Sequence, residues 1–151
     1  MIVTEQVTHL LNGTIETMKS IFPLTIQLGK PMLVEEPLYQ QEMGVLIGIT
    51  GDIPGRIMIQ SQQDVFSQLG QAMFGLPVEG EMLESFAGEV GNMIAGNLST
   101  VISQIGMTMD ITPPTVIVGD SKVYGFKRAF QLPVTMDTVG TFTVVLIMDE
   151  Q

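Results

Sequence analysis

Cysteine, histidine, positive charge and long apolar runs are all scarce in this chain of 151 residues. The absence of cysteine excludes disulfide bonds and metal sites built on thiolates. The single histidine, His9, has no second metal ligand at a suitable spacing, so we interpret it as a surface or boundary residue. No apolar run is long enough to span a bilayer, and the N-terminus lacks the pattern of a secretory signal. We therefore expect a cytoplasmic protein that does not insert into membranes.

The charge balance is strongly acidic, with 16 Asp and Glu against 6 Lys and Arg and a formal net charge of −10. An acidic chain without a basic run is poorly suited to bind phosphate backbones or anionic membranes, so nucleic acid is not expected as a partner. Apolar residues make up 45% of the chain and charged residues 15%, as in globular proteins. The length fits one domain, and we expect residues 1–151 to form it.

Hydrophobic spacing predicts three helices, at residues 3–22, 65–74 and 81–105. Ser61 or Asp64 is the expected N-terminal cap of the second helix, and Gly75 its C-terminal stop. Strands are predicted at 24–28, 43–50, 55–60, 107–111, 126–135 and 141–148, and the segment 116–125 is left unassigned. The four strands at 43–60 and 126–148 are expected to form two hairpins.

The order of these elements suggests an internal duplication. In each half a helix leads into a short strand, a proline break and a hairpin, with Pro31 corresponding to Pro113 or Pro114. Helices separated from antiparallel hairpins favour an α+β fold over a doubly wound parallel sheet. We therefore predict a pseudo-symmetric antiparallel sheet with the helices packed on one side.

The helix at 81–105 carries the clearest functional signal. Its apolar residues fall on one side of a helical wheel. The opposite side carries small polar residues around one acid and one amide, namely Ser85, Glu89, Asn92, Gly96, Ser99 and Ser103. A solvated surface helix could carry such residues without any function. However, Gly88, Gly91 and Gly96 surround the pair, and glycine costs a helix about 1 kcal/mol relative to alanine. Small residues at that cost suggest the close approach of another group.

The chemistry open to Glu89 and Asn92 is limited. An amide is not a general base near neutral pH, but it donates and accepts hydrogen bonds at once. It could therefore hold a water in line for attack on a phosphoryl group, as glutamines do in GTPases. The carboxylate, one turn away, could bind a cation of a partner. Ser85 has no histidine or lysine nearby to activate it, which argues against a serine hydrolase.

The motif Ser85-x-x-x-Glu89-x-x-Asn92, followed about twenty residues later by Pro113 and Pro114, resembles the signature of the CheC/CheX/FliY family of bacterial chemotaxis phosphatases. This resemblance covers nearly the whole chain and implies removal of phosphate from the aspartyl-phosphate of a CheY-like response regulator. It implies that Asn92 orients the attacking water and that Glu89 pairs with a lysine of the regulator. Ser85 matches the first motif position. The protein would need no cofactor of its own, because the regulator would hold the Mg²⁺.

Some members of this family carry two such helices. The first helix here offers Gln6 and His9 near the equivalent place, and Glu16 with Lys19 further along, but no acid followed three residues later by asparagine. A CheX-like protein with one site is therefore expected.

Two other functions stay open at this stage. The same helix could serve as the docking face of a non-catalytic receiver-binding adaptor or of a scaffold like those of the flagellar switch. The chain could also be a structural dimerisation domain, because segment 141–148 is apolar and would pair with a partner strand if its edge were free. The resemblance itself implies a homodimer that pairs through its sheet. Gly96 is expected to provide clearance for the regulator as it approaches Asn92.

Overall fold

The computed structural model describes residues 2–149, with side chains from Glu5 onward. The predicted helices and both predicted hairpins are confirmed. The elements in chain order are α1 (Ile2–Ile21), β1 (Ile26–Leu28), β2 (Met32–Glu35), β3 (Leu38–Gln40), β4 (Met43–Gly51), β5 (Gly55–Ser61), α2 (Gln63–Phe74), α3 (Glu81–Gln104), β6 (Met109–Ile111), β7 (Thr115–Val118), β8 (Ser121–Val123), β9 (Arg128–Met136) and β10 (Gly140–Met148).

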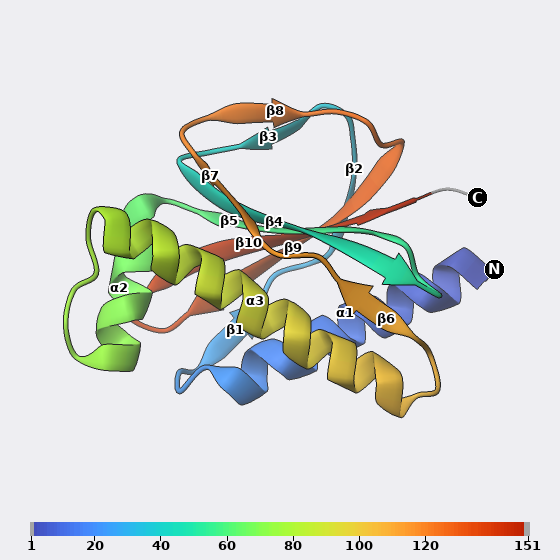
Figure 1. The fold of residues 1–151 in the computed structure, drawn as a ribbon, viewed down its shortest axis with the longest axis horizontal. Coiled ribbons are helices and arrows are strands. Elements are labelled where there is room, and N and C mark those ends of the chain that lie inside the picture. Colours follow the sequence, from blue (N-terminus) through green and yellow to red (C-terminus); the bar gives the residue numbers. More distant parts are fainter. Residues whose placement is uncertain (1, 150–151) are drawn as a thin grey trace.

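The elements form three layers, with the helices on one face of a large sheet and a small sheet on the other (Figure 1). The large sheet has eight strands in the order β1-β9-β10-β5-β4-β6, with β2 also paired to β9 and β7 to β4. Strands β3 and β8 make the small sheet, and every strand pair is antiparallel. The prediction of an α+β fold with helices on one side of an antiparallel sheet is thus confirmed.

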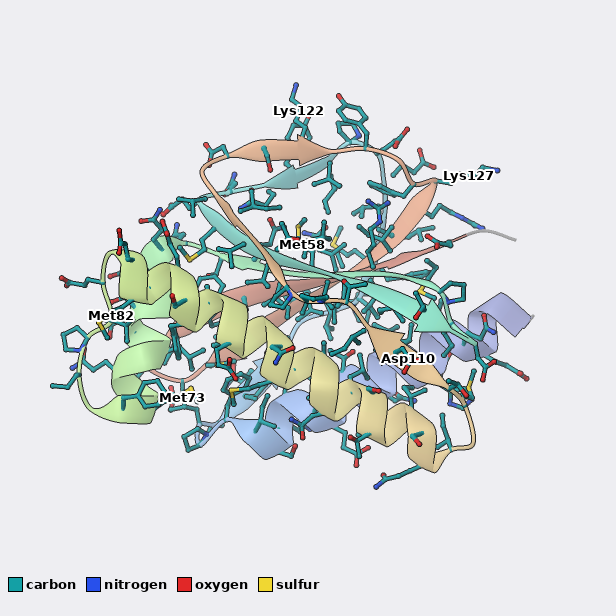
Figure 2. All side chains as sticks on the ribbon, in the orientation of Figure 1. Met58, Met73, Met82, Asp110, Lys122 and Lys127 are labelled. Atoms are coloured by element: carbon teal, nitrogen blue, oxygen red, sulfur yellow. The ribbon has the colours of Figure 1, made fainter. Side chains whose placement is uncertain are left out.

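Each face of the large sheet has its own hydrophobic core. On β5, Ile57 and Ile59 belong to the core under the helices, whereas Met58 belongs to the smaller core beneath β3 and β8. This alternation follows from the two-residue period of a strand, which sends successive side chains to opposite faces. Met58 is labelled in Figure 2 between the large sheet and the small one. No helix in the described part of the chain is long and apolar enough to cross a membrane.

The two halves of the sheet repeat one arrangement around the central β5–β10 pair. Strands β1 and β2 pair with β9 in the same way as β6 and β7 pair with β4. The first strands of the two sets begin at Ile26 and Met109, and the second at Met32 and Thr115, a constant offset of 83 residues. The same offset relates the last residues of α1 and α3, Ile21 and Gln104. It pairs Pro31 with Pro114, which decides between the two alignments that the sequence left open.

Several local expectations were wrong. The N-cap of α2 is Gln62, and neither Ser61 nor Asp64 caps it. Ser61 ends β5 instead, and its Oγ donates a 2.7 Å hydrogen bond to the carbonyl of Thr141. Gly75 does end the helix, with a left-handed φ of 78°. The sequence also failed to reveal the short strands β2, β3, β7 and β8.

Strand β10 has no free edge. It lies in the middle of the sheet, hydrogen-bonded to β9 on one side and to β5 on the other. The expectation that segment 141–148 could offer an unprotected edge to a partner is therefore wrong. Its apolar character reflects burial on both faces, because residues Val144 to Ile147 are all buried.

Candidate active site

Helix α3 lies flat against the large sheet and shows a narrow polar face to solvent. Its buried residues follow the helical period and pack against the sheet and the other helices: Leu83, Phe86, Ala87, Gly88, Val90, Gly91, Ile94, Ala95, Leu98 and Ile102. On the other side, Ser85, Glu89 and Asn92 are all exposed. The wheel analysis thus placed the acid and the amide correctly. It was wrong for Ile105, which is 49% exposed, and for Ser99, which is half-buried and bonded to the carbonyl of Met109.

An open groove of about 640 Å³ runs beside these polar residues. One wall is α3 and the other is the linker between β6 and β7. The lining residues are Ser85, Gly88, Glu89, Asn92, Ile111, Thr112, Pro113 and Pro114. The structure therefore brings together the acid, the amide, the serine and the two prolines that the sequence motif had grouped. Gly96 does not line this groove.

Neither Glu89 nor Asn92 is engaged by the protein itself. Among residues 5–149, whose side chains the structure describes, no hydrogen bond or ion pair involves either side chain. Helix α3 contains no Lys, Arg or His, and Lys122 and Lys127 point outward on the side of the small sheet (Figure 2). The carboxylate of Glu89 is thus left free to pair with a cation from outside.

The glycines of α3 serve different purposes. An added Cβ at Gly91 would lie 2.5 Å from Val45 Cγ1, and one at Gly88 would lie 3.3 Å from Val116 Cγ2. Both glycines therefore let α3 press closely against β4 and β7, and close packing, not clearance for a partner, explains them. An added Cβ at Gly96 would meet no heavy atom within 4 Å, so no contact within the described chain calls for glycine there.

The linker that faces α3 is held by β4. The N–H of Thr112 donates to the carbonyl of Gly48 at 3.0 Å, and the N–H of Gly48 donates to Thr112 Oγ1 at 2.8 Å. Sequence reasoning missed Thr112, although its place directly before Pro113 and Pro114 was an available signal. The proline pair itself was recognised, and it forms the outer part of this wall.

The equivalent place in the first half lacks the same chemistry. The offset of 83 residues pairs Gln6 with Glu89 and His9 with Asn92, as the sequence suggested. Gln6 is half-buried and its amide donates to the carbonyl of Asp52 at 3.2 Å, while His9 is exposed. Neither position carries an acid or an asparagine, so only the second half has the pair.

The groove contains one carboxylate, one amide and two hydroxyls. Within the described residues, no group of three or more His, Asp or Glu is arranged to hold a metal ion. Neither histidine nor lysine lines the groove beside Ser85, so the usual activating partners of a serine nucleophile are missing there. What the groove does offer is an amide that can orient a small molecule and an acid that can pair with a cation.

The helices on one face of an antiparallel sheet place this chain in an α+β fold that solved structures share. The chain has a TM-score of 0.79 to the chemotaxis protein CheX from Desulfovibrio desulfuricans, at 22% identity, covering 96% of this chain and 99% of the other. It has a TM-score of 0.78 to a chain in the CheX–CheY–BeF₃–Mg²⁺ complex from Borrelia burgdorferi, at 23% identity, with 95% and 97% covered.

The family follows from sequence. Residues 43–133 match the model of the chemotaxis phosphatase CheX family. The chain is also 32% identical over 145 residues to the CheY-P phosphatase CheX of Thermotoga maritima, which covers 93% of each protein. This chain belongs to the chemotaxis phosphatase CheX family. The family resemblance that the motif suggested is thereby confirmed.

Proposed function

We propose that this chain is a phosphatase that hydrolyses the aspartyl-phosphate of a CheY-like response regulator in chemotaxis. The observation that carries the proposal is the groove itself, in which an amide and an acid without partners face a wall of two prolines in a chain of the CheX family. The related Thermotoga protein is named a CheY-P phosphatase. The Borrelia structure contains CheX together with CheY.

In the proposed mechanism Asn92 orients the attacking water. The amide accepts a hydrogen bond from the water and donates one, which fixes the water in line with the phosphorus. The oxygen of the water bonds to phosphorus while the bond between phosphorus and the aspartyl oxygen breaks. The products are inorganic phosphate and the free carboxylate of the regulator. The protons of the water leave with the inorganic phosphate, and Asn92 takes neither of them, since an amide is not a base at neutral pH.

Glu89 holds the regulator in register by pairing with a lysine beside its phosphorylation site. The absence of an internal partner for Glu89 supports this role, because an exposed carboxylate without a cation is ready to bind one. Ser85 lines the same groove, and its proposed role is to contact the regulator there. Mg²⁺ belongs to the receiver domain, where it neutralises charge on the phosphoryl group. This chain is proposed to contribute no ligand to that ion.

We further propose that residues 1–151 act as one domain in the cytoplasm and that two copies form a dimer through the β1–β2 edge of the large sheet. Met32 and Leu33 on β2 are 58% and 52% exposed, so this edge offers apolar side chains that a partner strand would cover. The opposite edge, formed by β6 and β7, carries the linker of the groove, so a dimer there would obstruct the regulator.

The deciding experiment follows the decay of a phosphorylated CheY-like receiver with and without the protein. The wild-type chain should accelerate the loss of phosphate, and Asn92→Ala should abolish most of that acceleration while the receiver still binds. If the wild-type protein binds phosphorylated receivers without accelerating their decay, the chain is an adaptor and not a phosphatase. A panel of receivers from the source organism would identify the substrate.

A further inference from the structure

The wall of the groove opposite Asn92 is an irregularity in the sheet. Pairing of β6 with β4 ends at Ile111, opposite Ile49, and pairing of β7 with β4 resumes with Thr115 opposite Leu46. Three linker residues therefore face two residues of β4, as in a β-bulge. The extra residue pushes the linker out of the sheet, and this displacement makes the wall.

Thr112 fixes this bulge to β4 through both its backbone and its side chain. Its N–H donates to the carbonyl of Gly48, and its Oγ1 accepts the N–H of Gly48 at 2.8 Å. The side chain lies directly over the glycine, since an added Cβ at Gly48 would stand 3.1 Å from both Oγ1 and Cγ2 of Thr112. The hydroxyl thus replaces the ladder acceptor that a regular strand would have supplied to Gly48.

The other half of the molecule contains an equivalent bulge without any hydroxyl. There the linker between β1 and β2 faces β9, and Gly29 occupies the place of Thr112 while Pro133 occupies that of Gly48. Gly29 donates its N–H to the carbonyl of Pro133 at 2.8 Å, and proline has no N–H that needs an acceptor. The fold can therefore form this bulge with no side-chain hydrogen bond. The hydroxyl occurs in the half that carries Glu89 and Asn92.

We propose that Thr112 is a positioning residue of the phosphatase site, whose hydroxyl bond to Gly48 holds the linker 112–114 at a fixed distance from Asn92. This inference rests on the proposed function of the groove. The aspartyl-phosphate of the regulator enters between α3 and this linker, so the position of the linker limits where the phosphorus can lie relative to the water held by Asn92.

Rigidity of this wall matters for the rate because hydrolysis requires the water, the phosphorus and the leaving oxygen to lie in line. A misplacement of about 1 Å can cost up to about a hundredfold in rate. The linker lies at the edge of the large sheet, beside β4 and between β6 and β7. Removing the Thr112 hydroxyl takes away its bond to Gly48 and the 3.4 Å bond that it donates to the carbonyl of Pro113. This loss widens the range of linker positions without unfolding the sheet.

The test compares Thr112→Val with Thr112→Ser. Valine keeps the shape and removes the hydroxyl, while serine keeps the hydroxyl. We expect Thr112→Val to lower kcat for receiver dephosphorylation roughly tenfold, with KM changed less, and Thr112→Ser to restore most of the rate. Gly48→Ala provides a second route, since its Cβ would push Thr112 away from β4, and kcat should fall there as well.

Thr135→Val is the matched control. Thr135 is an exposed threonine on β9 in the other half, bonded through Oγ1 to Thr141 Oγ1 at 2.9 Å, and its loss should leave kcat unchanged. A Thr112→Val protein that melts at a lower temperature but keeps the full kcat would overturn the inference, as would a Thr112→Ser protein as slow as the valine variant. Asn92→Ala belongs in the same series. If Asn92→Ala is inactive while Thr112→Val is fully active, the positioning role of Thr112 fails and the proposed function survives. If Asn92→Ala is itself fully active, the proposed site fails.

Discussion

Gly91 of α3 lies directly over Val45 of β4, so closely that an added Cβ would stand 2.5 Å from Val45 Cγ1. In the sequence Gly91 lies between Glu89 and Asn92, but it is on the buried face of the helix and they are on the exposed face. The close contact between α3 and β4 therefore sets the distance of Glu89 and Asn92 from the sheet and from the linker between β6 and β7. Packing against the sheet fixes the backbone of the site, while the side chains of Glu89 and Asn92 face solvent without a partner in the described chain.

This contact predicts opposite effects of alanine at two glycines of one helix. Gly91→Ala should lower the free energy of unfolding by about 1–3 kcal/mol, because the new methyl group overlaps Val45. Gly96→Ala should raise it by roughly 0.5–1 kcal/mol, because the site is open and alanine favours the helix. Urea denaturation of both variants measures the difference. Equal effects of the same sign would contradict this account of the packing.

Asn92→Ala should reduce the acceleration of receiver dephosphorylation by about a hundredfold or more, as expected when a group that orients a reactant is lost. The fold and receiver affinity should stay nearly intact because the site is exposed. Asn97→Ala is the control, since Asn97 is also exposed on α3 but bonds to the carbonyl of Met93 and does not line the groove. Unchanged dephosphorylation by Asn92→Ala would refute the role of the amide.

Glu89→Gln should weaken binding of the phosphorylated receiver and make the remaining activity less dependent on salt. The reason is that an ion pair across the interface is screened by salt, whereas a hydrogen bond from a neutral amide is screened much less. Glu84→Gln removes an exposed acid from the first turn of the same helix, outside the groove, and should have little effect. The measurement is the dephosphorylation rate of the Glu89→Gln and Glu84→Gln variants over a range of ionic strength. Wild-type activity of Glu89→Gln at low salt would show that Glu89 has no part in binding.

Gly96→Leu tests whether clearance is the reason for glycine at this position. An added Cβ at Gly96 meets no heavy atom within 4 Å and leucine favours the helix over glycine, so thermal stability should be kept or raised. One turn beyond Asn92, the leucine should obstruct the receiver and impair binding and dephosphorylation together. Melting curves and the phosphatase assay on one purified variant give both answers. A stable Gly96→Leu protein with full activity would remove the clearance hypothesis, and Gly96→Ala serves as the small control.

The proposed dimer predicts that charge on β2 separates the subunits. Met32→Lys combined with Leu33→Lys should shift the protein from dimer to monomer in light scattering at micromolar concentration, because lysine on an edge strand opposes strand pairing. Val118→Lys places the same charge on β7, at the opposite edge, and should leave the dimer intact. A wild-type protein that is monomeric at this concentration would rule out the dimer.

The sequence by itself determined the elements whose signals are local. The helical period from Glu81 to Gln104 places Glu89 and Asn92 on an exposed face whatever the helix packs against. Alternation and turn residues likewise predict the hairpins β4–β5 and β9–β10, because their strands are neighbours in the chain. The sequence also showed the spacing of Pro113 and Pro114 from Glu89 and Asn92. It did not show that the prolines form the opposite wall of the same groove.

Only the tertiary structure decided the relationships between distant segments. The apolar pattern of 141–148 fits an edge strand or a central one. Pairing with β5, about 80–90 residues earlier in the chain, makes β10 central. Gly88, Gly91 and Gly96 look alike in the sequence, and they differ because only two of them face a strand. In the sequence Thr112 looks like any threonine in a loop, and only the fold brings it into hydrogen-bonding contact with Gly48. These pairings and packing contacts join residues that are far apart in the chain, and a local pattern of residue types does not specify which distant segments meet.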